Sequence, residues 1–421
     1  MESLDGKLIY QVFVRNHTNE GTIQGVIKDL DRIKDLGTDI LYLMPIHEIG
    51  IVERKGTYGS PYAIRDYYSI SKDLGTILDL KELIVETHNR NMQIIMDMVF
   101  NHTSPDSVIT DKHIEYYVMY EGMPNHRIVD WEDVIDLDTE RKDTQDYLIE
   151  VLKFYQKLGV DGFRFDVAGL IPIEFFARAR LALGNDTIFF AESLDPGFIK
   201  FLKKNRMHCE EDEDLVPTFD LLYNYNYFSR LDDFLKNRNQ DSFRDAMRII
   251  NKENVLHMDM LRANCVENHD IDRIASHLNK TQLFNMLALA ISMRGAAFIY
   301  AGEEYGLKHK PNLFEKDPVE WSLKDEEVCE FVKEMIELKK EFGLIKTQYI
   351  EEIGDLFIFK LTLRNGNKER VILINLNEEP VSLKKIIKES YDETLNQALN
   401  LKIEEGEIAL IEPMIFTFLT E

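Results

Sequence analysis

Cysteine is scarce in this chain: the 421 residues include only Cys209, Cys265 and Cys329. Their odd number and wide separation exclude a disulfide framework and match no metal-binding spacing. Long hydrophobic runs are also missing, since no apolar stretch approaches the ~18 residues of a membrane helix. The amino-terminal segment lacks the basic start of a signal peptide. Together these absences predict a cytoplasmic protein that does not bind a membrane.

Positive charge is in short supply as well. Acidic residues number 75 against 50 lysines and arginines, which gives a net charge of −25. Nucleic acids and anionic membranes attract clustered basic residues, so this balance argues against both as partners. The composition, 44% hydrophobic and 30% charged, is nevertheless that of a chain with a large core and not of a disordered one. The acidic excess fits a neutral ligand, or serves solubility alone.

Hydrophobic runs typical of strands alternate with amphipathic helical segments along most of the chain. The expected strands are Leu8–Val14, Ile40–Met44, Gln93–Val99, Gly162–Phe165, Thr187–Ala191, Leu215–Phe219, Ala263–Val266 and Ala297–Tyr300. The expected helices include Ile23–Leu36, Leu78–Arg90, Thr144–Leu158 and Gln282–Met293, where apolar residues recur every three to four positions. Eight strands alternating with helices predict a parallel TIM (β/α)8 barrel, with its site on the loops that follow the strands.

Two segments interrupt this alternation. Residues 102–136 carry no helical periodicity, and we interpret them as a short insert after the third strand. From residue 342 onward, strand-like runs at Leu356–Leu363, Arg370–Asn375 and Ile408–Phe418 replace the alternation. The expected organisation is therefore a catalytic barrel over residues 1–341 and a carboxy-terminal antiparallel β-sandwich domain over residues 342–421.

Four of the expected strands finish in acidic residues, arginine or histidine. These ends are Asp97–His102, Gly162–Asp166, Phe190–Glu192 and Val266–Asp270. In a closed parallel barrel all four ends lie on one face, which brings several carboxylates together. Such a cluster is suited to acid/base and nucleophilic chemistry on a polar bond. A metalloenzyme on the same barrel would need a histidine and aspartate ligand cluster, which the sequence does not display.

The residue types at these ends point to distinct roles. Arg164 and Asp166 lie two apart on a strand and share one face, so the guanidinium should keep that carboxylate ionised and oriented. Glu192 follows a very apolar strand, which should raise its pKa and suit it to donate a proton. Asp270 adds a third negative charge. One anionic and one protonated carboxyl group are the requirement for retaining glycoside hydrolysis.

Side chains that could hold a sugar accompany these acids. His102 and His269 are placed to donate to hydroxyl groups, and Tyr62 could stack on a ring face. The aromatic run Phe219–Phe228 could form a second stacking platform, but we interpret it as core packing because aromatic runs chiefly fill cores.

These motifs resemble those of the alpha-amylase family of glycoside hydrolases over most of the chain. The matching positions are Asp97 with Asn101 and His102, Gly162 through Arg164 to Asp166, Glu192, Asn268–Asp270 and Gly295–Glu304. The resemblance implies that Asp166 is the nucleophile, Glu192 the acid/base and Asp270 the stabiliser of the transition state. It also implies that Arg164, His102, His269 and Tyr62 bind substrate, and that Asp97 and Asn101 support the site. The fold it implies is the barrel, insert and carboxy-terminal β domain already expected.

The sequence departs from the family pattern at three places. Residues Val167–Leu170 replace the Lys-His pair that often follows the nucleophile. Ala63 replaces an aspartate after Tyr62, which favours a cleft open to internal bonds over an exo-acting pocket. In many relatives the residue matching Asn101 helps to bind calcium, but one asparagine falls short of the about six to eight oxygens that calcium needs. We therefore expect no cofactor or metal, with a structural calcium as the less favoured alternative.

The sequence thus predicts a retaining glycoside hydrolase that cleaves α-1,4-glucosidic bonds in maltooligosaccharides or α-glucans. Two alternatives use the same catalytic set: a 4-alpha-glucanotransferase and an exo-acting alpha-glucosidase. A third, a catalytically inactive sugar-binding protein, requires the loss of a carboxylate, and the carboxylates of the motif are all present.

Overall fold

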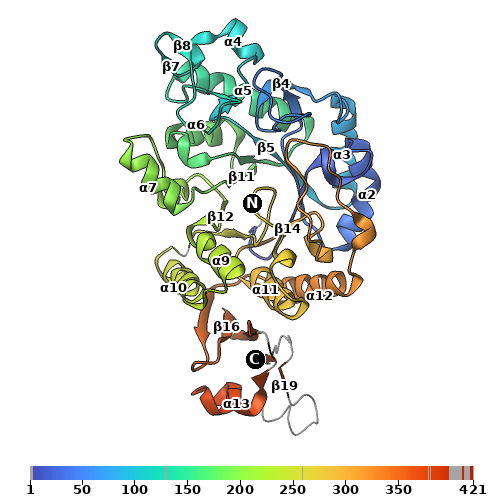
Figure 1. The fold of residues 1–421 in the computed structure, drawn as a ribbon, viewed down its shortest axis with the longest axis vertical. Coiled ribbons are helices and arrows are strands. Elements are labelled where there is room, and N and C mark those ends of the chain that lie inside the picture. The colour runs from blue at the N-terminus through green and yellow to red at the C-terminus, as the bar shows by residue number, and fades with distance from the viewer. Residues whose placement is uncertain are drawn as a thin grey trace.

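The computed structural model describes residues 3–128, 130–257, 259–377, 379, 381–397, 410–411 and 418–420. Eight parallel strands close into a barrel in the order β1-β14-β13-β12-β11-β10-β5-β2, with β2 pairing back to β1 (Figure 1). The strands are β1 (Leu8–Val12), β2 (Ile40–Leu43), β5 (Gln93–Met98), β10 (Gly162–Phe165), β11 (Ile188–Ala191), β12 (Leu221–Tyr223), β13 (Arg262–Asn264) and β14 (Ala296–Tyr300). The predicted (β/α)8 barrel is confirmed.

The helices cover the outside of this barrel. They include α2 (Ile23–Asp35), α3 (Ile77–Asn89), α5 (Lys142–Leu158), α6 (Ile173–Leu183), α7 (Pro196–Lys204), α9 (Tyr225–Asn237), α10 (Gln240–Leu256), α11 (Lys280–Ser292) and α12 (Glu326–Phe342). Thr76 forms a capping box at the start of α3. Gly159 ends α5 with a φ of 107°, a left-handed conformation that glycine adopts without strain. No helix in the described part of the chain is long and apolar enough to cross a membrane.

Alternation along each strand divides the apolar residues into two layers. Ile188 and Phe190 of β11 belong to the cluster inside the barrel, whereas Phe189 and Ala191 belong to the larger cluster under the helices. A residue that follows an inward-facing position by two therefore also faces the barrel axis. This periodicity positions the polar residues at the strand ends.

The sixth strand lies six residues later than the sequence prediction of Leu215–Phe219, which is wrong. Residues 212–215 form the short helix α8 (Asp212–Leu215), and the strand is β12. The backbone of Asp220 donates to the carbonyl of Phe189, and its carboxylate accepts from the Phe189 amide. This anchoring to β11 starts β12 at the next apolar run.

The insert after the third strand is short and irregular. It contains β6 (His102–Thr103), α4 (Val108–Lys112), β7 (Met119–Tyr120), β8 (Met123–Pro124) and β9 (Ile135–Asp136). Strands β6 and β9 pair antiparallel, so the insert leaves and returns beside His102. Figure 1 shows it at the end of the molecule opposite the carboxy-terminal region.

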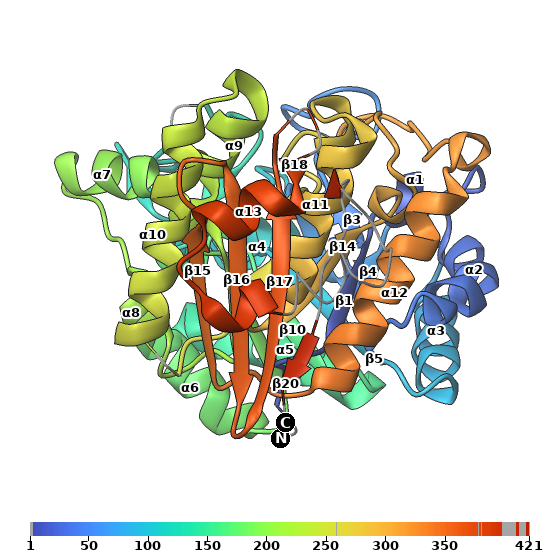
Figure 2. The same ribbon diagram turned by 90° about the horizontal axis from the view of Figure 1, so that it is seen from below.

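The carboxy-terminal region is built on an antiparallel sheet of β15 (Thr347–Glu352), β16 (Ile358–Asn365), β17 (Lys368–Asn375) and β20 (Phe418–Thr420). Figure 2 shows this sheet lying across the barrel helices, with α13 (Leu383–Glu389) on its other side. A two-stranded ribbon pairs β18 (Val381–Ser382) with β19 (Leu410–Ile411). The expected strands at 356–363 and 370–375 are present, whereas most of 408–418 lies outside the described residues. The exact domain boundaries and the sandwich arrangement stay predictions.

Candidate active site

The site is built on the register between β5 and β10. Arg164 is the direct neighbour of Asp97 across this pair, and Phe190 is its neighbour on β11. Because Phe190 faces the barrel axis, Arg164 and Asp97 do so as well. The backbone approach here is close: a Cβ on Gly162 would come within 2.4 Å of the Ile188 carbonyl oxygen. Only glycine fits that position of β10.

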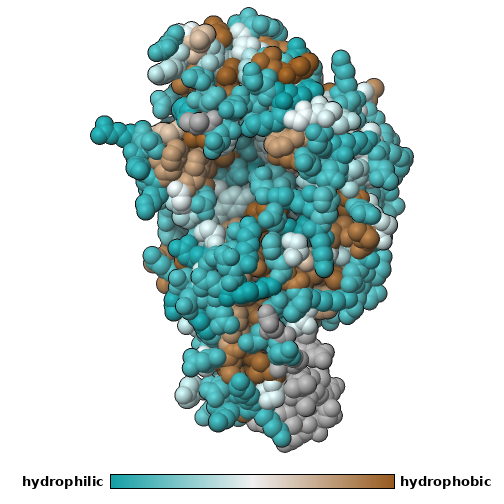
Figure 3. Space-filling model, viewed as in Figure 1, coloured by the Kyte–Doolittle hydropathy of each residue, from teal (hydrophilic) through white to brown (hydrophobic). Residues whose placement is uncertain are grey.

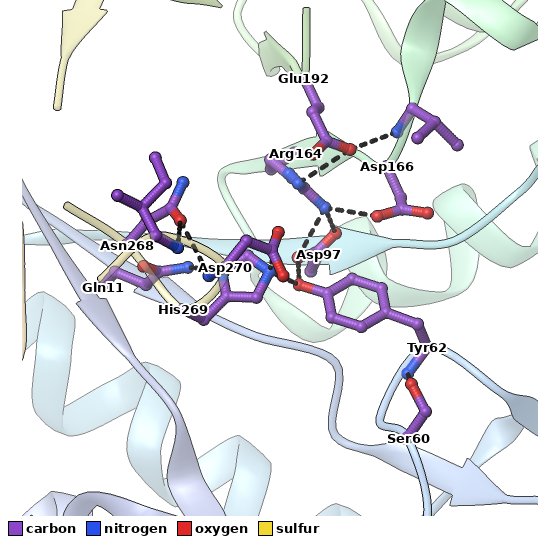
Figure 4. A network of polar contacts seen from close by, with 12 residues as sticks. Gln11, Ser60, Tyr62, Asp97, Arg164, Asp166, Glu192, Asn268, His269 and Asp270 are labelled. Carbon is purple, nitrogen blue, oxygen red and sulfur yellow. Dashed lines mark hydrogen bonds and ion pairs between the residues drawn. The ribbon is translucent and has the colours of Figure 1, made fainter. Parts of the chain in front are cut away.

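Arg164 is fully buried and contacts three carboxylates. Its Nη1 donates to Asp97 at 2.7 and 2.9 Å and to Asp166 Oδ1 at 2.9 Å. Its Nη2 forms an ion pair with Glu192 Oε2 at 3.0 Å. Figure 4 shows Glu192 and Asp166 on two sides of the guanidinium, with Asp97 beneath them. The arginine therefore fixes both predicted reacting carboxylates relative to each other.

Glu192 is held a second time, by the backbone that follows the nucleophile. The Val167 amide donates to Glu192 Oε2 at 2.6 Å. Val167 adopts φ 39° and ψ 50°, a left-handed conformation that is strained for a β-branched residue. In this conformation the amide points toward Glu192 Oε2, and Glu192 Oε1 takes part in neither contact.

Burial raises the pKa of both Asp166 and Glu192, and a neighbouring carboxylate raises each further. For Asp166 the largest cause is burial, followed by the charge of Glu192, and Arg164 opposes both. For Glu192 burial is again the largest cause, Arg164 opposes it, and Asp270 raises the pKa further. Two carboxyl groups this close titrate as a pair, and the first proton lost makes the second harder to remove. The pair is therefore built to share one proton.

A second group joins Tyr62, His269 and Asp270. The Tyr62 hydroxyl lies 3.1 Å from Asp97 Oδ2 and 2.6 Å from His269 Nε2, and the two rings are stacked. His269 is held from the other side by Gln11, 2.9 Å from Nδ1. Asp270 lies 3.1 Å from His269, and its side chain remains 51% exposed. Although its surroundings oppose ionisation, the charge and hydrogen bond of His269 lower the pKa of Asp270 to about 2.

His102 and Asn101 lie where the insert leaves the barrel. Asn101 Nδ2 is 3.1 Å from His102 Nδ1, and the His102 ring packs on Trp131 at 5.3 Å. Burial lowers the pKa of His102 to about 4, so its imidazole is neutral near pH 7. Contacts of Arg164, Tyr62 and His269 link seven of the nine residues that the sequence singled out, whereas Asn101 and His102 form a pair where the insert begins.

Sequence reasoning missed three contributors to the site: Gln11, Val167 and Tyr42, whose hydroxyl donates to Asp97 at 2.6 Å. It also treated the aromatic run 219–228 as uniform. Tyr223 and Tyr227 are buried, as expected for packing. Tyr225 instead lines a cavity of about 370 Å³, together with Phe228, Ile271, Glu192 and Asp270. The surface around the hollow over the barrel is mostly hydrophilic (Figure 3).

The residues around Asn101 do not fit a structural calcium ion. Asn101 Oδ1 accepts a hydrogen bond from Arg127 Nη2 at 3.1 Å, so a positive group already lies at the expected ligand. Among the described residues, no group of three or more histidine, cysteine or acidic side chains could hold a metal.

The comparisons with known proteins agree on one family. The alpha-amylase catalytic domain matches residues 11–132 and 210–342. An alpha-amylase of Lactobacillus plantarum of known structure is 34% identical, with a TM-score of 0.84 and 90% of each chain covered. A maltogenic alpha-amylase of Thermotoga neapolitana is 29% identical, with a TM-score of 0.78 and 90% of this chain and 87% of that chain covered.

More distant relatives are longer than this chain. Alpha-amylase 2 of Dictyoglomus thermophilum is 24% identical over 385 residues, which are 85% of this chain and 64% of the relative. The cyclomaltodextrinase of Thermoanaerobacter pseudethanolicus is 26% identical over 400 residues, 84% of this chain and 65% of the relative. The chain therefore spans slightly less than two thirds of the length of these two proteins.

Proposed function

Because the chain belongs to the alpha-amylase family of glycoside hydrolases, we propose that it hydrolyses α-1,4-glucosidic bonds in maltooligosaccharides and related α-glucans, with retention of configuration. The observation that carries this proposal is the contact of Asp166 and Glu192 with one guanidinium, at 2.9 and 3.0 Å. Retaining enzymes need their two carboxyl groups about 5–5.5 Å apart, whereas inverting enzymes need room for a water between them. A shared arginine favours the shorter separation.

In the first step Asp166 attacks the anomeric carbon while Glu192 gives its proton to the departing glycosidic oxygen. The bond to the leaving sugar breaks as a glycosyl ester forms on Asp166. In the second step Glu192, now ionised, takes a proton from water, whose oxygen attacks the same carbon and releases Asp166. Arg164 carries the compensating positive charge through both steps, since it contacts both carboxylates.

The mechanism requires the shared proton on Glu192 in the free enzyme. Asp166 receives a hydrogen bond from Arg164, which favours its ionised form. Asp270, with its pKa lowered to about 2, is ionised and raises the pKa of nearby Glu192. We assign Asp270 the further role of stabilising positive charge on the distorted sugar ring, because its carboxylate is exposed toward the cleft.

The leaving sugar would occupy the cavity beside Tyr225. That cavity is lined by Glu192 and Asp270 but not by Asp166, so it lies on the side of the proton donor. Its volume of about 370 Å³ suits a sugar unit. Carboxylates of Asp195, Asp232 and Asp272 also line it and outnumber Lys236, which pairs with the last two. This charge favours a neutral sugar over a phosphorylated one, because like charges repel.

Product analysis tests the substrate and the mode of attack. A linear maltodextrin should give a mixture of short maltooligosaccharides from the earliest time points, because Ala63 leaves the end of the cleft without the aspartate of exo-acting relatives. Glucose as the sole early product would instead indicate the exo-acting alternative. With maltotriose, early appearance of longer oligomers together with glucose would indicate a glucanotransferase.

The stereochemical claim has its own experiment. Proton NMR during the first turnovers should show the α-anomer of the new reducing end before mutarotation. Initial β-anomer would refute retention and with it the role of Asp166 as nucleophile. No hydrolysis of any α-glucan would support the inactive sugar-binding alternative.

The proposal also includes a cytoplasmic location and no required cofactor. The three cysteines are free thiols, two buried and one partly buried, which suits a reducing compartment. Fractionation of the producing cells, with activity measured in the soluble intracellular and external fractions, would test the location.

A further inference from the structure

Arg127 lies in the insert. It contacts Asn101 and Asp136, the residues at which the insert leaves and returns. Its Nε donates to Asp136 Oδ2 at 2.6 Å, and its own backbone amide donates to the same oxygen at 2.9 Å. Its Nη2 donates to Asn101 Oδ1 at 3.1 Å. Asp136 and Asn101 are each 1% exposed, whereas the Arg127 side chain is 32% exposed. A single cation therefore joins the end of β9 to the residue before β6.

The contact also decides how the Asn101 amide is oriented. A guanidinium has only donors, so the oxygen of Asn101 must face Arg127 and its nitrogen must face away. That nitrogen lies 3.1 Å from His102 Nδ1, which must accept the bond. With Nδ1 accepting this bond, the His102 ring carries its proton on Nε2, the nitrogen that can donate to a substrate hydroxyl group.

Asp136 depends on Arg127 for its charge balance. Its second oxygen, Oδ1, is buried and has no hydrogen-bond partner among the described residues. The neighbouring carboxylate of Asp133 is paired with Lys55 at 2.8 Å and so competes little for Arg127. Removal of the guanidinium would leave a buried, uncompensated carboxylate, which is strongly destabilising.

We propose that Arg127 is a built-in cation that takes the place of a structural calcium ion, and that it positions His102 through Asn101. The protein is accordingly independent of calcium. The positioning part of this inference rests on the proposed function, because it is read out as glucan hydrolysis. The structural part does not, because it is read out as thermal stability.

The first experiment compares melting temperatures of the full-length protein with EDTA and with millimolar calcium chloride. The wild type should melt at the same temperature in both. The variants are Arg127→Met, Arg127→Lys and the control Arg141→Met. Arg141 also pairs with one carboxylate, but its side chain is 41% exposed and that of Asp143 is 61% exposed. We expect Arg127→Met to lower the melting temperature by about 3–6 °C, Arg127→Lys to recover part of the loss, and the control to match the wild type.

The second experiment measures kcat and KM on maltotetraose well below the lowest melting temperature, where every variant is folded. Arg127→Met should lower kcat/KM about tenfold or more, the range for a lost charge-assisted contact, and Arg127→Lys should restore part of it. The control should behave as the wild type.

Three results would overturn all or part of the inference. A wild-type melting temperature that falls in EDTA and recovers with calcium would show that a metal ion, and not Arg127, stabilises this part of the insert. Equal melting temperatures of Arg127→Met and the control would remove Arg127 from its structural role. Unchanged kcat/KM in folded Arg127→Met would remove the positioning role. If no glucan is hydrolysed by the wild type, the proposed function fails, while the melting data still decide the role of the cation.

Discussion

Replacing His47 by phenylalanine should remove part of the sensitivity of this protein to acid. His47 lies in β3 (His47–Ile49), is 1% exposed, and packs edge-on against Tyr67 and Tyr155, with ring centroids 5.8 and 5.5 Å away. Neither ring nitrogen has a hydrogen-bond partner among the described residues. Burial lowers the pKa of His47 to about 4, and the charge of Asp66 opposes this only in part.

The size of the effect follows from proton linkage. The unfolded chain has a histidine pKa of about 6.5, so between this value and about 4 it binds more protons than the folded protein. His47 therefore costs no stability above pH ~6.5, and its cost grows as the pH falls and is complete near the folded pKa. At about 1.4 kcal/mol per pKa unit, the full cost is about 3 kcal/mol.

Urea unfolding between pH ~7.5 and ~4.5 would measure this cost. His47→Phe should lose about 2.5 kcal/mol less free energy of unfolding over that range than the wild type. Near neutral pH it should be as stable as the wild type within about 1 kcal/mol, because the aromatic packing is kept and two unpaired nitrogens are removed. A control, His309→Gln, alters a side chain that is 61% exposed and should follow the wild-type curve. Parallel curves for His47→Phe and wild type would refute a neutral, buried His47.

Four further outcomes follow from the structure. Asp166→Asn and Glu192→Gln should each lower kcat on maltooligosaccharides by at least about 10²-fold with little change in melting temperature; near-normal turnover would remove that residue from its role. Wild-type activity should fall as the pH rises past the raised pKa of Glu192, because the proton donor is lost, and the residual activity of Glu192→Gln should lack this alkaline limb in a pH–rate profile. Tyr225→Ala should lower kcat/KM on maltotetraose about tenfold, but less on an aryl maltoside, whose leaving group does not fill the cavity; equal losses on both would place Tyr225 outside the leaving-group site. Gly162→Ala should destabilise the barrel by at least about 2 kcal/mol in thermal unfolding, because its Cβ would collide with the Ile188 carbonyl; an unchanged melting temperature would contradict this.

Much of the fold could be predicted because local patterns of apolar residues and glycines in the sequence determine its helices and strands. The helices at 23–36 and 144–158 have one apolar face and give way to Gly37 and Gly159, and the structure ends them there within one residue. The sixth strand could not be placed the same way. Two short apolar runs flank Asp220, and only the bonds of Asp220 to Phe189 select the second run as the strand.

In the candidate site, too, local sequence patterns predicted some residues and not others. Its reacting groups were visible because the acids and the arginine lie near or just after the ends of apolar strands, and a parallel barrel gathers strand ends at one face. Their partners were not visible. Arg127 is an ordinary charged residue in the sequence, and Gln11 and Tyr42 read as parts of apolar strands.

By itself, then, the sequence determined the barrel and which strand ends carry carboxyl groups, since both depend on residue type and on periodicity over a few positions. Only the tertiary structure decided which nitrogen of Arg164 each carboxylate contacts, that Tyr225 faces a cavity while Tyr223 and Tyr227 are buried, and that a guanidinium lies against Asn101. The physical reason is that these contacts join residues many positions apart. Strand register and loop path set their geometry, and neither leaves a local signal in the order of the amino acids.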